Sequence, residues 1–88
     1  MNIKNVKKLT QPSGYRLWKK SMTIILKYKK LYFLVEKIHH GPDYETVNHV
    51  VINMFLRTLG DNYVNDIVTM DTAYDVWTYR NYRICVTV

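Results

Sequence analysis

Large apolar residues recur every three or four positions around two tryptophans that lie about sixty residues apart. An α-helix turns once in about 3.6 residues, so each set falls along one face of a helix. This spacing predicts two amphipathic helices that bury their tryptophans, and it constrains the fold more than any other feature. The first set is Tyr15, Trp18, Met22, Ile25 and Leu26, and the second is Ala73, Val76 and Trp77.

A third apolar repeat fills the middle of the chain and predicts the longest helix. It follows the segment His39-His40-Gly41-Pro42, where Gly and Pro together predict a turn. Asp43 is the expected N-cap, and Glu45 adds negative charge at the positive end of the helix dipole. Gly60 is expected at the C′ position, just after the helix. The repeat consists of Val47, Val50, Val51, Met54, Phe55 and Leu59.

Shorter elements complete the expected fold. Ser13 is the expected N-cap of the first helix. Apolar segments follow at residues 31–38 and 63–68, and Asp71 or Thr72 is expected to cap the last helix. The pattern predicts an all-α fold, a small bundle of four to five helices. The expected core consists of Trp18, Met22, Ile25, Leu26, Leu34, Val51, Met54, Phe55, Leu59, Ile67, Val76 and Trp77.

Length and composition favour one small domain. The chain has 88 residues, 48% of them apolar, which is enough for one modest core and argues against disorder. We expect a basic lead-in at residues 1–12, the helical domain at residues 13–83 and an apolar tail at residues 84–88. The single cysteine, Cys85, excludes an internal disulfide. No apolar stretch has the length of a signal peptide or a membrane span, so we expect a cytoplasmic protein without a membrane partner.

Charge is unevenly divided along the chain. The net charge is +6, but residues 1–42 hold ten Lys and Arg and one acid, whereas residues 43–88 hold three Arg and six acids. Such a chain can attract a polyanion at its basic end or bind copies of itself head to tail. Alternatively, the basic half forms a solvated surface that binds no specific partner. Lysine-rich surfaces favour diffuse, sequence-independent contact with RNA phosphates. The possible RNA contacts are Lys4, Lys7, Lys8, Lys19, Lys20, Lys27, Lys29 and Lys30.

Aromatic side chains interleaved with lysines can stack on nucleic-acid bases. For Tyr15, Trp18 and Trp77, the position on an apolar stripe favours core packing instead, with a hydrogen-bond partner for each indole N–H. Five other tyrosines follow no stripe, and two interpretations stay open: an interaction surface, or scattered amphipathic surface residues. They are Tyr28, Tyr32, Tyr44, Tyr79 and Tyr82.

No pattern in the sequence indicates an enzyme, a cofactor or a small-molecule substrate. His39, His40 and His49 lack the spacing of a metal site. Asp71-Thr72-Ala73 looks like the active-site triplet of a retroviral aspartic protease, but no glycine follows Gly60 to build the flap that such an enzyme needs. The sequence also lacks a nucleophile–base pair and a glycine-rich phosphate loop, so we expect no catalytic activity.

The order of these motifs resembles the N-terminal region of the Gag polyprotein of copia-type retrotransposons, over residues 9–79. The resemblance implies an all-α, capsid-like lobe that self-associates into particles and packages RNA. Arg80 replaces the leucine that usually continues the last helix of the family, and no zinc knuckle is present, so the chain looks like a truncated or domesticated copy. The core signature is Tyr15, Trp18, Met22, Leu26, Leu59, Thr72, Ala73, Val76 and Trp77, with Leu9, Leu31, Val35, Ile52 and Ile67 as further matches.

These observations lead to one functional expectation and two alternatives. We expect a Gag-like structural protein that forms homo-oligomers, with non-specific RNA binding as a second property. The alternatives are a monomeric, basic, helical nucleic-acid-binding domain and a protein–protein adaptor that binds through its tyrosine surface.

Overall fold

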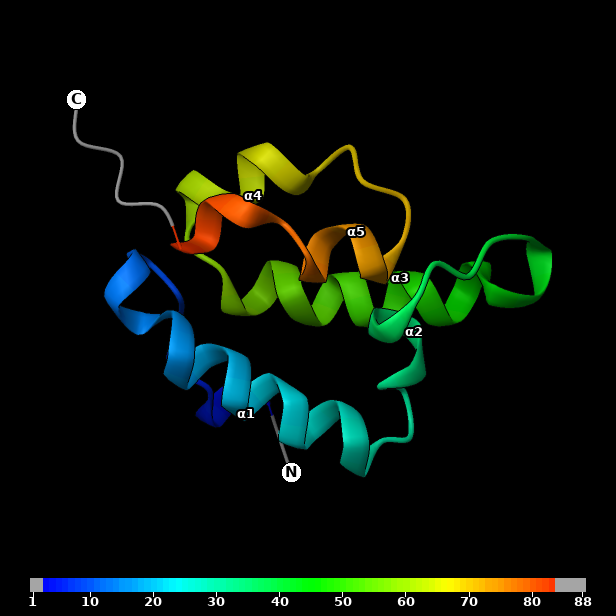
Figure 1. Cartoon of the computed structure of the whole chain (residues 1–88), viewed down its shortest axis with the longest axis horizontal. Coiled ribbons are helices and arrows are strands. Elements are labelled where there is room, and N and C mark those ends of the chain that lie inside the picture. Colours follow the sequence, from blue (N-terminus) through cyan, green and yellow to red (C-terminus); the bar gives the residue numbers. More distant parts are fainter. Residues whose placement is uncertain (1–2, 84–88) are drawn as a thin grey trace.

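The computed structural model describes residues 3–83, apart from the side chains of Asn81 and Arg83. It confirms the predicted all-α fold with five α-helices, and residues 3–83 form no strand. In Figure 1, α3 runs through the middle of the molecule, α1 lies along one edge and α4 along the opposite edge. The helices are α1 (Tyr15–Tyr28), α2 (Phe33–Glu36), α3 (Pro42–Thr58), α4 (Asp61–Ile67) and α5 (Ala73–Trp77), with 3-10 turns η1 (Ile3–Asn5), η2 (Pro12–Gly14) and η3 (Arg80–Arg83).

One hydrophobic core joins all five helices. Each of the twelve side chains expected in the core is buried, which confirms that prediction in full. The core also takes in five residues from outside that set, three of them in α2, α4 and α5 and two outside the α-helices. These five are Leu9, Val35, Tyr63, Ala73 and Tyr82.

Helix α1 begins and ends differently from the prediction. Its N-cap is Gly14 rather than Ser13, because Pro12–Gly14 forms a 3-10 turn ahead of the helix and no side chain caps the first turn. At the other end, Lys30 adopts the left-handed conformation with φ 61°. The N–H of Leu31 then reaches back to the carbonyl of Leu26 at 2.8 Å. This is the Schellman ending that usually has glycine at the left-handed position.

Helix α3 begins at the predicted break, although its cap is not the expected one. Gly41 is the N-cap, with φ 103°, and Pro42 takes the first helical position, so Asp43 lies inside the helix. A proline fits there because its missing N–H has no partner in the first turn. Asp43 and Glu45 in the first turn and Arg57 in the last complement the helix dipole.

The N-terminal segment, ahead of residue 13, packs against the helices. Leu9 is fully buried and pairs with Leu59 in an isolated parallel bridge. Its N–H donates to the carbonyl of Thr58 at 2.9 Å, and its carbonyl accepts from the N–H of Gly60 at 2.8 Å. Gly60 has φ −70°, so it is not the left-handed C′ residue expected. Its missing side chain matters for another reason: a Cβ there would lie 3.2 Å from the Leu9 carbonyl oxygen.

Helix α5 is held by a predicted cap and by an unexpected brace. Thr72 is the N-cap: its hydroxyl accepts from the N–H of Asp75 at 3.3 Å and donates to the Asp75 carboxylate at 2.9 Å. The buried Asn48 of α3 accepts from the N–H of Ala73 at 3.0 Å and donates to the carbonyl of His39 at 2.9 Å. One amide therefore joins the start of α5 and the loop before α3 to the centre of the fold.

The expected apolar tail, residues 84–88, lies outside the described residues. Within residues 3–83, no helix has both the length and the apolar character needed to cross a lipid bilayer.

Candidate nucleic-acid interface

Trp18, one of the aromatic residues of the predicted signature, packs in the core. Trp18 is 1% exposed, with Phe55, Trp77 and Tyr82 ring centroids between 5.3 and 5.9 Å from its own. Its indole N–H donates to the Thr58 hydroxyl at 3.0 Å, which supplies the partner that a buried indole requires. Trp18 therefore has no face exposed for stacking on a base.

The whole core signature lies in or against the core. Tyr15 is only partly buried, and its ring stacks on Tyr82 with the centroids 6.2 Å apart. The remaining signature residues are buried and carry no exposed chemistry. They are Trp18, Met22, Leu26, Leu59, Thr72, Ala73, Val76 and Trp77.

Tyr82 does not belong to the surface, which excludes both open interpretations for this residue. It is fully buried, and its hydroxyl donates to the Val76 carbonyl at 2.7 Å. Burial, with smaller contributions from Tyr79, Tyr15 and Tyr63, raises the pKa of the Tyr82 hydroxyl far above its ordinary value near 10. After α5 the chain returns to α1, where the Tyr82 ring packs against Tyr15 and Trp18. No apolar repeat in the sequence predicts this contact.

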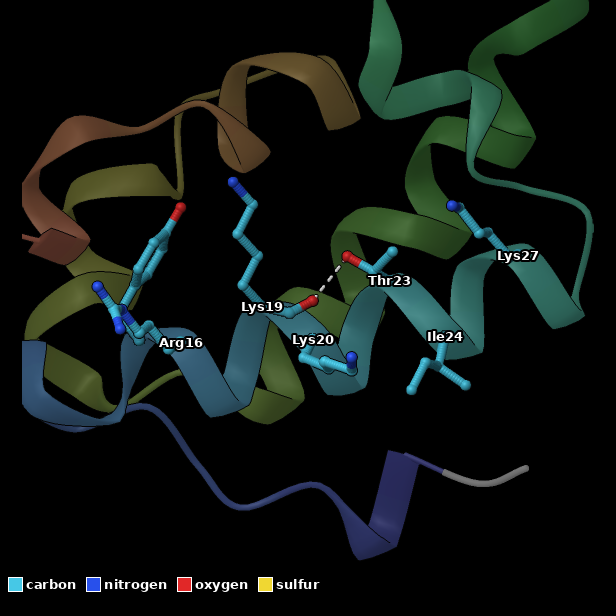
Figure 2. Close-up of a pocket in the computed structure, with 7 residues that line it drawn as sticks. Arg16, Lys19, Lys20, Thr23, Ile24 and Lys27 are labelled. Carbon is cyan, nitrogen blue, oxygen red and sulfur yellow. Dashed lines mark hydrogen bonds between the residues drawn. The ribbon is translucent and has the colours of Figure 1, made fainter.

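The outward side of α1 brings together part of the predicted RNA-contact set. Lys19, Lys20 and Lys27 line one open hollow of about 570 Å³, together with Arg16 (Figure 2). Helix α1 contains no acidic residue, so no carboxylate on the same helix offsets these four cations. Positions 16, 20 and 27 follow the helical repeat and point the same way. The uncharged side chains of the hollow are Tyr15, Thr23 and Ile24.

Aromatic rings hold two of these ammonium groups in place. The Lys19 Nζ lies 5.7 Å from the Tyr15 ring centroid and 5.9 Å from that of Trp77. The Lys27 Nζ lies 4.9 Å from the centroid of Tyr32. Figure 2 shows Lys19 directed toward α5, whereas Lys20 lies on the outer side of α1. Cation–π contact at such exposed sites contributes about 0.5–1 kcal/mol, so Lys19 and Lys27 also serve the fold.

The other five predicted lysines are exposed but do not line this hollow. Lys4 lies in η1, and Lys7 and Lys8 follow it. Lys29 and Lys30 end α1, where positive charge complements the helix dipole. The structure therefore gathers three of the eight lysines at one place and adds Arg16. That arginine is identifiable from sequence, since it lies four positions before Lys20.

The histidines form a separate feature. His39, His40 and His49 line a hollow of about 390 Å³ at the start of α3, with Glu45 and Asp71 among its other walls. Among residues 3–83, no three side chains of the metal-binding types are grouped closely enough to hold an ion.

The ring of His39 lies against the rings of Phe33 and Tyr44, with centroid distances of 5.1 and 4.9 Å. Its Nδ1 is 3.0 Å from the Lys37 carbonyl oxygen. These contacts give the ring a packing role at the surface.

No protein-family model, curated protein or solved structure matches this chain. The resemblance to copia-type Gag therefore remains a prediction that rests on the order and spacing of the motifs.

Proposed function

We propose that this chain is a non-enzymatic assembly domain, similar to the N-terminal region of copia-type Gag, which self-associates in the cytoplasm and binds RNA without sequence preference. The outward face of α1 is the observation that carries the proposal. There Arg16, Lys20 and Lys27 lie beside the exposed apolar side chains Leu17 and Ile24. Cations attract phosphates, whereas exposed apolar groups favour contact with another protein. One helix therefore offers both kinds of contact.

The packing of α1 supports a binding role for its outer face. The opposite side of the helix buries Trp18, Met22, Ile25 and Leu26 in the core. Side chains on a helix anchored in this way keep their relative positions better than side chains on a loop. The outer cations therefore form a stable spacing that a flexible polyanion can follow.

Self-association is tested by measuring molar mass with light scattering over a range of protein concentrations at physiological salt, without nucleic acid. We expect the mean mass to rise from that of the 10.6 kDa chain toward dimers and larger species. A strict monomer at high concentration would contradict the assembly function and favour a monomeric nucleic-acid-binding domain.

RNA binding is tested by fluorescence anisotropy with two single-stranded RNAs of equal length and different sequence. We expect equal affinities that fall as salt rises from 50 to 200 mM, because bound phosphates release counterions. Lys20→Gln with Lys27→Gln should weaken binding and reduce the slope of log K against log salt by about 1.4, or about 0.7 per lost contact. The matched control, Lys37→Gln with Arg57→Gln, removes one exposed cation after α2 and one in α3. It should change RNA binding less than the α1 variant does. An affinity that does not respond to salt would rule the RNA proposal out.

The runner-up, a monomeric nucleic-acid-binding domain, is favoured by the exposure of all eight predicted lysines. The adaptor alternative has a smaller tyrosine surface than the sequence suggested, because Tyr82 is buried and Tyr32 and Tyr79 are partly buried. Its exposed tyrosines are Tyr28 and Tyr44.

A further inference from the structure

Helix α1 carries an exposed apolar stripe next to its cations. Leu17, Ile24 and Tyr28 are 58%, 41% and 67% exposed. They occupy positions i, i+7 and i+11, which align along one side of a helix. Exposed apolar groups in a row favour contact with another surface, since contact removes them from water.

The charges of α1 restrict what can cover this stripe. The stripe runs beside Lys20 and Lys27, and α1 contains four cations and no acid. If two copies paired through this side of α1, Lys20 and Lys27 of one copy would lie close to the same cations of the other. Opposed like charges destabilise such a contact. An acidic surface therefore suits the stripe better than a second basic one.

The opposite edge of the same molecule has that character. Residues 58–79 contain four aspartates and no Lys or Arg, and three of the aspartates are exposed: Asp61, Asp66 and Asp71. Val68, between Asp66 and Asp71, is 65% exposed. In Figure 1, α4 lies on the edge of the molecule opposite α1. The exposed aspartates and Val68 lie on α4 and in the loop after it, and their charge is opposite to that of the cations on α1.

We propose that copies of this chain bind head to tail, with the acidic face of one copy seated on the basic face of the next. The basic face consists of Leu17, Lys20, Ile24, Lys27 and Tyr28, and the acidic face of Asp61, Asp66, Val68 and Asp71. The arrangement rests on the proposed self-association and specifies its interface. Because the two faces differ and lie on opposite edges, each bound copy keeps one face uncovered. Such heterologous contacts continue into rings or open filaments.

The size of α1 sets the strength of each contact. A helix of 14 residues is about 21 Å long, and one side of it is about 10 Å wide. This footprint is well below the roughly 800 Å² per partner that a standard stable interface buries. Each contact is therefore weak, and assembly should depend steeply on protein concentration.

The sign of the salt effect distinguishes the possible arrangements. We measure molar mass by sedimentation velocity at 50 and 300 mM salt, at one high protein concentration and without nucleic acid. Head-to-tail binding pairs opposite charges, so salt should lower the mean mass. Pairing of α1 with α1 would bring like charges together, and salt would then raise the mean mass. A rise would overturn the head-to-tail arrangement.

Two variants locate the faces. The basic-face variant is Lys20→Gln with Ile24→Gln, and the acidic-face variant is Val68→Gln with Asp71→Asn. Each should shift the wild-type mass distribution toward the monomer. The matched control is Lys37→Gln with Val50→Gln, which changes one exposed cation and one exposed apolar residue elsewhere and should assemble as the wild type does. Circular dichroism checks that every variant keeps its helices.

Mixing the two face variants gives the sharpest outcome. Each keeps one intact face, so the mixture should form a 1:1 heterodimer that cannot grow. The head-to-tail arrangement is wrong if neither variant reduces assembly relative to the wild type, or if the mixture stays monomeric. The proposed self-association would still stand in either case. A wild type that is monomeric at every concentration overturns the proposed self-association and this interface together.

Discussion

Among single residues, a few buried polar groups make the packing of the apolar core possible. Thr58 shows why: its hydroxyl accepts the indole N–H of Trp18 at 3.0 Å and donates to the Met54 carbonyl at 3.0 Å. Without that hydroxyl, the indole N–H would be buried without a partner, at a cost of about 1–3 kcal/mol. A buried threonine on α3 thus makes the burial of Trp18 favourable.

Tyr82 gives a pH-dependent stability that can be measured. Burial raises the pKa of its hydroxyl above the ordinary value near 10, so the unfolded chain loses this proton first as pH rises. The contribution to stability is fully present below about pH 10 and is lost above it, by up to about 1.4 kcal/mol per pH unit. We expect the urea midpoint of the wild type to fall steeply between pH 10 and 11.

The control for this prediction is Tyr82→Phe, which keeps the ring. At pH 7 it should lower the free energy of unfolding by about 1 kcal/mol, because the hydrogen bond to the Val76 carbonyl is lost. Above pH 10 its midpoint should fall less steeply than that of the wild type. Equal alkaline slopes would mean that Tyr82 ionises in the folded protein as readily as in the unfolded chain.

At the scale of elements, the end of α1 carries local strain. Lys30 occupies the left-handed region at φ 61°, where a side chain costs about 1–2 kcal/mol and glycine costs little. Lys30→Gly should therefore raise the free energy of unfolding by about 1 kcal/mol, after part of the gain is offset by the greater freedom of glycine in the unfolded chain. Urea denaturation followed by circular dichroism measures the change.

Lys29→Gly is a matched control for this prediction, because it removes the same charge one position earlier. Lys29 has an ordinary right-handed conformation with φ −83°, so glycine there should lower stability by about 0.5–1 kcal/mol. Opposite signs for the two variants would support the strain at Lys30. A loss of stability in both would show that the ammonium groups matter more than the backbone.

At the scale of the whole molecule, folding turns the division of charge along the chain into a division in space. The basic first half contributes η1 and α1, with α1 along one edge, and α4 of the acidic segment 58–79 lies along the opposite edge (Figure 1). RNA phosphates and the acidic face of a second copy would both bind the cations of α1. The two proposed partners should therefore compete.

Competition can be measured with a short single-stranded RNA of about eight nucleotides, too short to hold many copies. We expect its addition to lower the mean molar mass of the assembled protein, because each bound RNA covers the basic face of one copy. A neutral oligomer of the same length, such as a peptide nucleic acid, should leave the mass unchanged. An increase in mass with the short RNA would place RNA and the second copy on different surfaces.

The amino-acid pattern alone predicts most of the helices and most of the core, because helical periodicity is a local property. The apolar repeats around Trp18 and Phe55 predict α1 and α3, and all twelve expected core residues are buried. Of the two caps predicted for the last helix, Asp71 or Thr72, the structure selects Thr72, whose hydroxyl accepts from an N–H three residues later.

The burial of residues outside these repeats depends on contacts between distant segments. Leu9 enters the core because it pairs with Leu59, fifty residues later, and Asn48 is buried because it accepts from the N–H of Ala73. Tyr82 is buried because the chain after α5 returns to α1 and packs its ring against Tyr15 and Trp18. Such contacts join segments far apart in the sequence, and no local spacing encodes them. The outer face of α1 is a similar case. Its charged residues can be read from the sequence, but which of them remain exposed depends on how the helices pack.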